Sequence, residues 1–386
     1  MRRFFAIVIW LLTAQLAAAT GIPTAGGGSF VAAAQNVLEQ RLFADADDGR
    51  LDEFSPLQAA LVAGGVEDAD SLRHYEQKAA MLVNELRHSA SSIDSPRGQV
   101  EVIFEFLHHR VLRGGYDLTS TDLRRALDAG RFNCVSATVL FNYFAGELGL
   151  DCRGLEMPGH AMSRVVLPKR PREGSTGTDS VCLDVETTCP RWFHLAGNPK
   201  RQAAAAKQTI GGATSTDRSK AREVSPLQVA AMIYYNRGVD FLAEKRFSEA
   251  ASANAKALRL DPGNATARGN LLATINNWSI ALGDTERFAD AVDLLRQGRA
   301  IDANFKAFGQ NYVHVHHKWV EHLCHEGRFG EALEILSRAA AEMPDRDYLR
   351  RAQTEVHERW EKAIAASPRP GPMLQMPCIG YVSPID

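Results

Sequence analysis

In the C-terminal half of this 386-residue chain, the same residue types recur at a spacing of 41 positions. Three phenylalanines are separated by this step, and three alanines repeat it, at Phe247, Phe288 and Phe329 and at Ala250, Ala291 and Ala332. A fixed step of this size is typical of repeat architectures, in which each unit buries its apolar face only against its neighbours. We therefore expect this half of the chain to form a stack of similar units.

The first unit resembles a tetratricopeptide repeat, because seven of its residues have the offsets of that motif: Tyr234, Gly238, Phe241, Phe247, Ala250, Ala257 and Pro262. The resemblance implies three such units over residues 231–346, an all-α solenoid, and a groove that binds a protein partner. The later units are longer, and we expect their extra residues, near 265–271 and 307–312, to extend helices. The alternative is that the repeats only brace the rest of the chain. A capping helix is predicted over 347–366, followed by a proline-rich tail over 367–386.

Upstream of the repeats, the stretch from Val135 to Leu148 is apolar on nearly every face, which predicts a helix surrounded by protein. Asn133 can cap its start by accepting first-turn amides, and Gly149 can end it in the left-handed conformation. Cys134 then occupies the first helical position, where unpaired amides and the helix dipole stabilise a thiolate. On the helix alone, a small buried core residue is the simpler interpretation of Cys134.

Two strands are expected after this helix. Residues 161–167 are rich in valine and leucine, and residues 181–186 alternate strictly, so we predict a hairpin across the polar loop 169–180. His160 opens the first strand, and the alternation places Asp184 and Glu186 on one face of the second. Cysteine, histidine and a carboxylate are the three groups that a thiol nucleophile needs.

Three short motifs resemble those of the transglutaminase-like branch of the papain-like superfamily. They are Phe132-Asn133-Cys134, Pro158-Gly159-His160 and Glu186-Thr187-Thr188, and the resemblance covers roughly residues 100–193. It implies an α+β transglutaminase-like (papain-like) domain, which we assign to residues 96–196, before the all-α repeats.

The resemblance also implies roles for the residues of these motifs. Cys134 would be the nucleophile and His160 its base. Either carboxylate could orient His160: Glu186 stands at the family's acid position and is favoured, while Asp184 has the more usual residue type. Asn133 and the Cys134 amide, at the helix start, would support an oxyanion hole whose second donor the sequence does not identify.

The N-terminus has the charged, apolar and small-residue zones of a secretory signal, in Met1 to Arg3, Phe4 to Leu12 and Ala17 to Ala19. We predict a signal peptide over 1–19 and an exported protein, periplasmic or extracellular, without stable membrane insertion. The formal charge is −2, and −4 once Arg2 and Arg3 are removed, so nothing predicts nucleic-acid binding.

The remaining segments are assigned by pattern. Residues 29–95 are expected to form an N-terminal helical subdomain, and residues 197–225, poor in large apolar residues, a linker or long surface loop. No cofactor or metal is expected. Five clustered histidines are taken as solvated helix residues: His314, His316, His317, His322 and His325. With Cys134 free, six cysteines allow at most two disulfides, and none is assigned.

Two hypotheses of function follow. The first is an exported thiol enzyme that attacks an amide of a protein or peptide through Cys134, forms a thioester, and passes the acyl group to water or an amine. The second is a catalytically inactive scaffold whose repeats recruit a protein partner.

Overall fold

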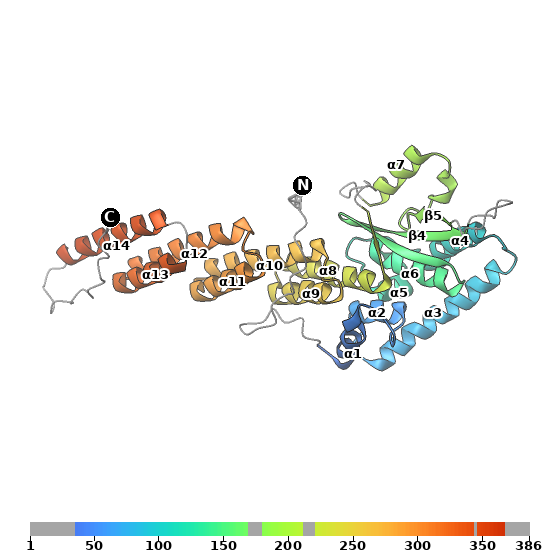
Figure 1. Ribbon diagram of the computed structural model, residues 1–386, viewed down its shortest axis with the longest axis horizontal. Helices are drawn as coiled ribbons and strands as arrows, with labels where there is room; N and C mark the ends of the chain where they lie inside the picture. The colour runs from blue at the N-terminus through green and yellow to red at the C-terminus, as the bar shows by residue number, and fades with distance from the viewer. Residues whose placement is uncertain (1–34, 169–179, 211–220, 343–345, 367–386) are drawn as a thin grey trace.

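The computed structural model describes residues 35–168, 180–210, 221–342 and 346–366 (Figure 1). The signal-like segment, most of the loop 169–180 and the tail 367–386 lie outside the described residues, so those expectations stay predictions. The described chain is mixed α+β: helices dominate, with a small four-stranded sheet and a two-stranded pair. The helix pairs of the C-terminal half extend away from the sheet-bearing part in a row (Figure 1).

The described residues of the predicted N-terminal segment, 29–95, are helical. They form α1 (Val37–Asp45), η1 (Ala46–Asp48), α2 (Pro56–Ala63) and α3 (Ala69–Ala90). After them come α4 (Pro96–Phe106), the π-helical turn η2 (Leu107–Val111) and α5 (Leu123–Ala129). Side-chain caps explain where several of these helices begin. Ser55 and Gln58 form a reciprocal capping box at α2, and Ser95 caps α4 before a proline at the first helical position.

Two sheets follow. The pair β1 (Gly115–Tyr116) and β2 (Arg131–Phe132) is parallel. The larger sheet has the order β5-β4-β3-β6, all antiparallel, formed by β3 (Asp151–Met157), β4 (His160–Pro168), β5 (Ser180–Val185) and β6 (Arg222–Val224). The predicted hairpin is confirmed, because Val165 lies opposite Leu183. β3 was not predicted.

The cysteine-bearing helix α6 (Cys134–Glu147) is the centre of this part of the fold. It packs on β3 and β4 on one side and on α2, α4, α5 and α8 (Pro226–Ala243) on the others. Gly149 has φ 78°, and the Leu150 amide donates to the Ala145 carbonyl at 3.0 Å, which ends the helix as predicted. The apolar run therefore forms the buried helix that the sequence indicated.

The linker expected over 197–225 is corrected by the structure. The described residues of this segment include the helix α7 (Pro199–Thr209) and the strand β6. The short helix η3 (Phe193–Leu195) lies just before the segment. β6 pairs with β3, with Gly154 opposite Val224, and Val224 is buried. The composition missed β6 because three residues are too few to show an alternating pattern.

The repeat region consists of helix pairs in the predicted period. The pairs are α8 with α9 (Phe247–Leu260), α10 (Ala265–Asp284) with α11 (Phe288–Ile301), and α12 (Lys306–His325) with α13 (Phe329–Glu342). The expected helix extensions near 265–271 and 307–312 lie inside α10 and α12. Each second helix begins with a phenylalanine stacked on a tryptophan of the next first helix, at ring distances of 6.5, 6.1 and 6.2 Å.

The last of these tryptophans, Trp360, lies in α14 (Arg346–Ala365). The predicted capping helix thus repeats the first helix of a fourth unit. A left-handed turn also recurs at the 41-residue step, at Lys245, Glu286 and Gly327, with φ near 60°, 61° and 74°. The same turn before each second helix explains why the units stack alike.

The first helix pair, α8 with α9, packs into the core of the sheet-bearing part. From the sequence we had instead separated the repeats from that part by a linker over 197–225. The Lys256 ammonium of α9 pairs with the Glu39 carboxylate of α1 at 2.8 Å, and both side chains are buried. Arg222 of β6 pairs with Glu156 and with Asp261, at 2.5 and 2.6 Å. These ion pairs fix α9 to the rest of the fold, and Tyr234 of α8 donates to the same Glu39 carboxylate at 2.8 Å.

Within the described residues, no helix has both the length and the apolarity needed to cross a membrane.

Candidate active site

Asn133 caps the helix that carries Cys134. Its Oδ1 accepts the amides of Val135 and Ser136 at 3.0 and 3.1 Å, and its own amide donates to the Ser136 hydroxyl at 2.9 Å. Its Nδ2 donates to Thr121 Oγ1 at 2.5 Å, which ties the cap to the loop before α5. The Cys134 amide is the first of the helix, and such an amide has no partner inside its own helix.

His160 lies between Cys134 and a carboxylate. A turn at Gly159, with φ 73°, places His160 at the start of β4. Its Nε2 is 2.7 Å from Glu186 Oε2, and its Nδ1 is buried without a hydrogen-bond partner among the described residues. The Cys134 side chain is close enough to this ring to raise its pKa. The structure thus brings together the three residue types in the order Cys134, His160, Glu186.

The choice between the two acids is decided by contacts. Glu186 follows the last residue of β5 and is held by Thr188, whose amide and hydroxyl donate to Glu186 Oε1 at 3.1 and 2.6 Å. Asp184 instead accepts two hydrogen bonds from the Arg164 guanidinium, at 2.7 and 3.1 Å. Glu186 is therefore the acid that contacts His160, and Asp184 belongs to an ion pair between β4 and β5.

The charges of this pair follow from its surroundings. Burial alone lowers the pKa of His160, but its interactions with Cys134 and Glu186 outweigh burial and raise the pKa to about 10. Burial raises the pKa of Glu186, yet the bonds from His160 and Thr188 bring it below its ordinary value. Both changes favour a buried imidazolium and carboxylate at neutral pH.

The turn that carries Glu186 is anchored from two sides. Thr187 Oγ1 lies 3.3 Å from Thr138 Oγ1 of α6. His108, in the π-helical turn η2, lies near Glu186 and the Thr187 carbonyl, and packs on Phe132. Burial is the main cause that lowers the pKa of His108 to about 4, so this imidazole is neutral. We had not singled out His108, although π-helical turns are frequent at functional sites.

Tyrosines from two distant parts of the chain complete the surroundings of Cys134. Tyr116, of β1, lies within electrostatic range of Cys134 and Glu186. Tyr235, of α8, is buried within electrostatic range of Cys134, and its hydroxyl donates to Glu156 Oε1 at 3.1 Å. The sequence missed both, because no local pattern relates residue 116 or 235 to residue 134.

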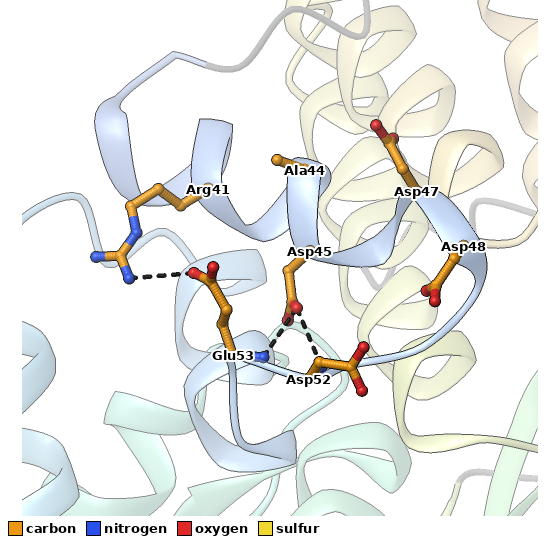
Figure 2. A pocket seen from close by; sticks show the side chains of 7 residues that line it. All are labelled: Arg41, Ala44, Asp45, Asp47, Asp48, Asp52 and Glu53. Atoms are coloured by element: carbon orange, nitrogen blue, oxygen red, sulfur yellow. Dashed lines mark hydrogen bonds and ion pairs between the residues drawn. The ribbon is translucent and has the colours of Figure 1, made fainter.

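Other features of the fold do not form a second site of this kind. An open depression of about 530 Å³ lies at the α1–α2 connection, lined by Arg41, Ala44 and five acids (Figure 2). Its Asp45 accepts the backbone amides of residues 52 and 53 (Figure 2) and also that of residue 54, so it holds the loop. In the part of the chain that the structure describes, no group of three or more His, Cys, Asp and Glu side chains could hold a metal ion.

The clustered histidines differ in part from expectation. His316 is buried rather than solvated, with Nδ1 2.8 Å from the Tyr312 carbonyl, whereas His314, His317 and His325 are exposed. The five described cysteines are free; Cys182 is exposed, and Cys378 lies outside the described residues.

Comparison with known proteins gives no relative for this chain: no protein-family model, curated protein or solved structure matches it significantly.

Proposed function

We propose that this protein is a thiol enzyme of the transglutaminase-like (papain-like) class, with Cys134 as nucleophile, His160 as acid and base, and Glu186 as the group that orients His160. The observation that carries the proposal is the position of His160: its Nε2 is 2.7 Å from Glu186 Oε2, and its buried Nδ1, without a hydrogen-bond partner among the described residues, is available to the neighbouring Cys134 thiol. An imidazole held between a thiol and a buried carboxylate is the arrangement that activates a cysteine nucleophile.

The reaction would proceed in two steps. The Cys134 thiolate attacks the carbonyl carbon of an amide, a C–S bond forms, and the π electron pair moves to oxygen. When the tetrahedral intermediate collapses, the C–N bond breaks and the His160 imidazolium gives its proton to the departing amine, leaving a thioester. Water or an amine then attacks the thioester, His160 takes its proton, and Cys134 leaves as thiolate. Hydrolysis of a peptide is the simplest outcome.

We further propose that the 41-residue units are tetratricopeptide-type repeats that bind a protein partner or substrate, and that the chain is exported. The first unit is fixed to the sheet-bearing part through the Lys256–Glu39 and Arg222–Asp261 ion pairs. A partner held by the later units would therefore be presented at a constant distance from Cys134. The support for export is the N-terminal sequence, with its apolar run and small residues.

A scaffold without catalysis is the second candidate, and burial of the site favours it. Cys134 is 6% exposed and His160 3%, so a substrate must reach a thiol that is largely covered.

Acetylation by p-nitrophenyl acetate at pH 7 tests the proposal, with mass mapping of the cysteine-containing peptides. We expect the wild-type protein to carry a transient acetyl group on Cys134 that glycinamide removes, and the Cys134→Ser protein to carry none there. Cys189→Ser is the matched control, since Cys189 is another buried thiol of the same part of the fold. A folded wild-type protein that is never acetylated at Cys134 would refute the enzyme and leave the scaffold.

A further inference from the structure

The turn after β5 brings Thr188 to the carboxylate of Glu186. The Cys189 amide donates to the Glu186 carbonyl at 3.4 Å, which closes a turn over residues 186–189. Within this turn, the Thr188 amide and hydroxyl both donate to Glu186 Oε1, at 3.1 and 2.6 Å. Thr188 is fully buried, so bulk water does not compete for either bond. One residue, two positions away, therefore binds one carboxylate oxygen twice.

The two oxygens of Glu186 thus have different partners. Oε1 is bound by Thr188, and Oε2 lies 2.7 Å from His160 Nε2. The last torsion of a glutamate side chain has broad minima, so a carboxylate that is bound at one oxygen only is free to turn. A hydroxyl bond of 2.6 Å to a carboxylate is of the short, charge-assisted kind, and it supplies a second anchor.

Other titratable groups surround Glu186, but among the described residues the donors to its carboxylate are His160 and Thr188. The further groups within its electrostatic range are His108 of η2, Tyr116 of β1 and Cys189. Burial keeps these three neutral at neutral pH, because it lowers the pKa of the imidazole and raises the pKa of the phenol and of the thiol. Cys134 of α6 lies within range of His160. The orientation of the carboxylate therefore depends on Thr188.

We propose that Thr188 is a positioning residue of the candidate site: its amide and hydroxyl hold Glu186 Oε1, so that Oε2 stays directed at His160. The inference rests on the proposed function, in which Glu186 orients His160. Two steps of that reaction need the imidazole in place, when it gives a proton to the departing amine and when it takes one from the attacking water or amine. Thr188 exchanges no proton in either step and acts only through Glu186.

Thr187 is the matched control within the same turn. It is equally buried, but its hydroxyl lies 3.3 Å from Thr138 Oγ1 of α6 instead of at the Glu186 carboxylate. Thr188→Val and Thr187→Val each remove one buried hydroxyl and nearly keep the shape of the side chain. Thr188→Ser keeps both the hydroxyl and the amide. Circular dichroism and the urea midpoint show whether each variant is folded.

The quantity to measure is the pKa of His160, by NMR titration of protein labelled with ¹³C at the histidine Cε1 carbons. The sign of the change separates positioning from a simple effect on charge. If the Thr188 hydroxyl only withdraws charge from the carboxylate, its removal makes Glu186 a stronger partner and raises the pKa of His160. If the hydroxyl positions the carboxylate, its removal lets Oε2 turn away from Nε2, and the pKa falls.

We expect the pKa of His160 to fall by about 1 pH unit in Thr188→Val, the size of one lost hydrogen bond to a charged group. It should change by less than about 0.3 in Thr187→Val and return to within about 0.3 of wild type in Thr188→Ser. An unchanged or raised pKa in Thr188→Val would overturn the proposal, and so would a Thr188→Ser protein that resembles Thr188→Val. An equal fall in Thr187→Val would assign the effect to packing of the turn and overturn it too.

If Thr188→Val does not fold, the wild-type protein decides the question. The Thr188 hydroxyl proton should be visible by NMR, because a buried bond to a carboxylate protects it from exchange with water. A hydroxyl proton that exchanges too fast to be observed would overturn the proposal. Failure of the proposed function is a separate result, in which wild-type Cys134 is not acetylated, since the titration of His160 does not depend on acyl transfer.

Discussion

The two acids near the end of β5 allow a sharp test of the site, because they differ by two positions and only one contacts His160. Glu186 Oε2 is 2.7 Å from His160 Nε2, whereas Asp184 is bonded to Arg164. In Glu186→Gln the carboxylate charge is lost while the side-chain length is kept. In Asp184→Asn a comparable charge is lost from the neighbouring ion pair.

The magnitude follows from the buried bond. A hydrogen bond to a charged group contributes about 1.5–3 kcal/mol, and 1.36 kcal/mol corresponds to one pH unit. Glu186→Gln should therefore lower the pKa of His160 by about 1 to 2 pH units from its raised value of about 10. Asp184→Asn should change it by less than about 0.3, since the Arg164 guanidinium already compensates Asp184.

The assay is an NMR titration of protein labelled with ¹³C at the Cε1 carbons of its twelve histidines. The His160 signal is identified by its loss in His160→Gln. An unchanged His160 titration in Glu186→Gln would refute the assignment of Glu186, and so would an equal change in Asp184→Asn.

Three further predictions concern stability. Lys256→Met leaves the buried Glu39 carboxylate without its cation, so the free energy of unfolding, measured by urea denaturation, should fall by about 3–5 kcal/mol. A loss under about 1 kcal/mol would contradict the buried ion pair. Gly238→Ala should destabilise the protein, because an added Cβ would lie 2.4 Å from the Asn254 side chain. Gly269→Ala should stabilise it by about 0.5–1 kcal/mol, because an added Cβ there would have nothing within 4 Å. Melting temperatures of the two variants that move in the same direction would contradict this contrast. Because folding raises the pKa of His160 from 6.5 to about 10, the wild type should lose stability relative to His160→Gln as pH rises through that window, and a constant difference would argue against the ion pair.

Much of the fold followed from periodicity and caps. The apolar run after Asn133 predicted α6, and the alternation before Glu186 predicted β5 and its partner. The 41-residue step predicted the helix pairs. It also recurs in Trp278, Trp319 and Trp360, a signal that we did not use and that would have identified α14 as the start of a fourth unit.

The parts that the sequence did not predict are short or non-local. β1 has two residues and β6 three, too few for a pattern, and their pairing depends on the rest of the fold. Tyr116 lies within electrostatic range of Cys134 because β1 pairs with β2, which ends two residues before Cys134. The choice between Asp184 and Glu186 needed the position of Arg164, which strand alternation alone does not give.

The most direct test of the central claim is the rate of Cys134 alkylation by iodoacetamide as a function of pH, followed by peptide mass mapping in the wild-type and His160→Ala proteins. A thiolate paired with an imidazolium reacts well below the pH of about 8.5 at which a free thiol ionises. We predict that the wild-type profile rises at such low pH and that removal of His160 moves it to alkaline pH. Identical profiles in the two proteins, or labelling only after unfolding, would make Cys134 a buried core residue and contradict the account.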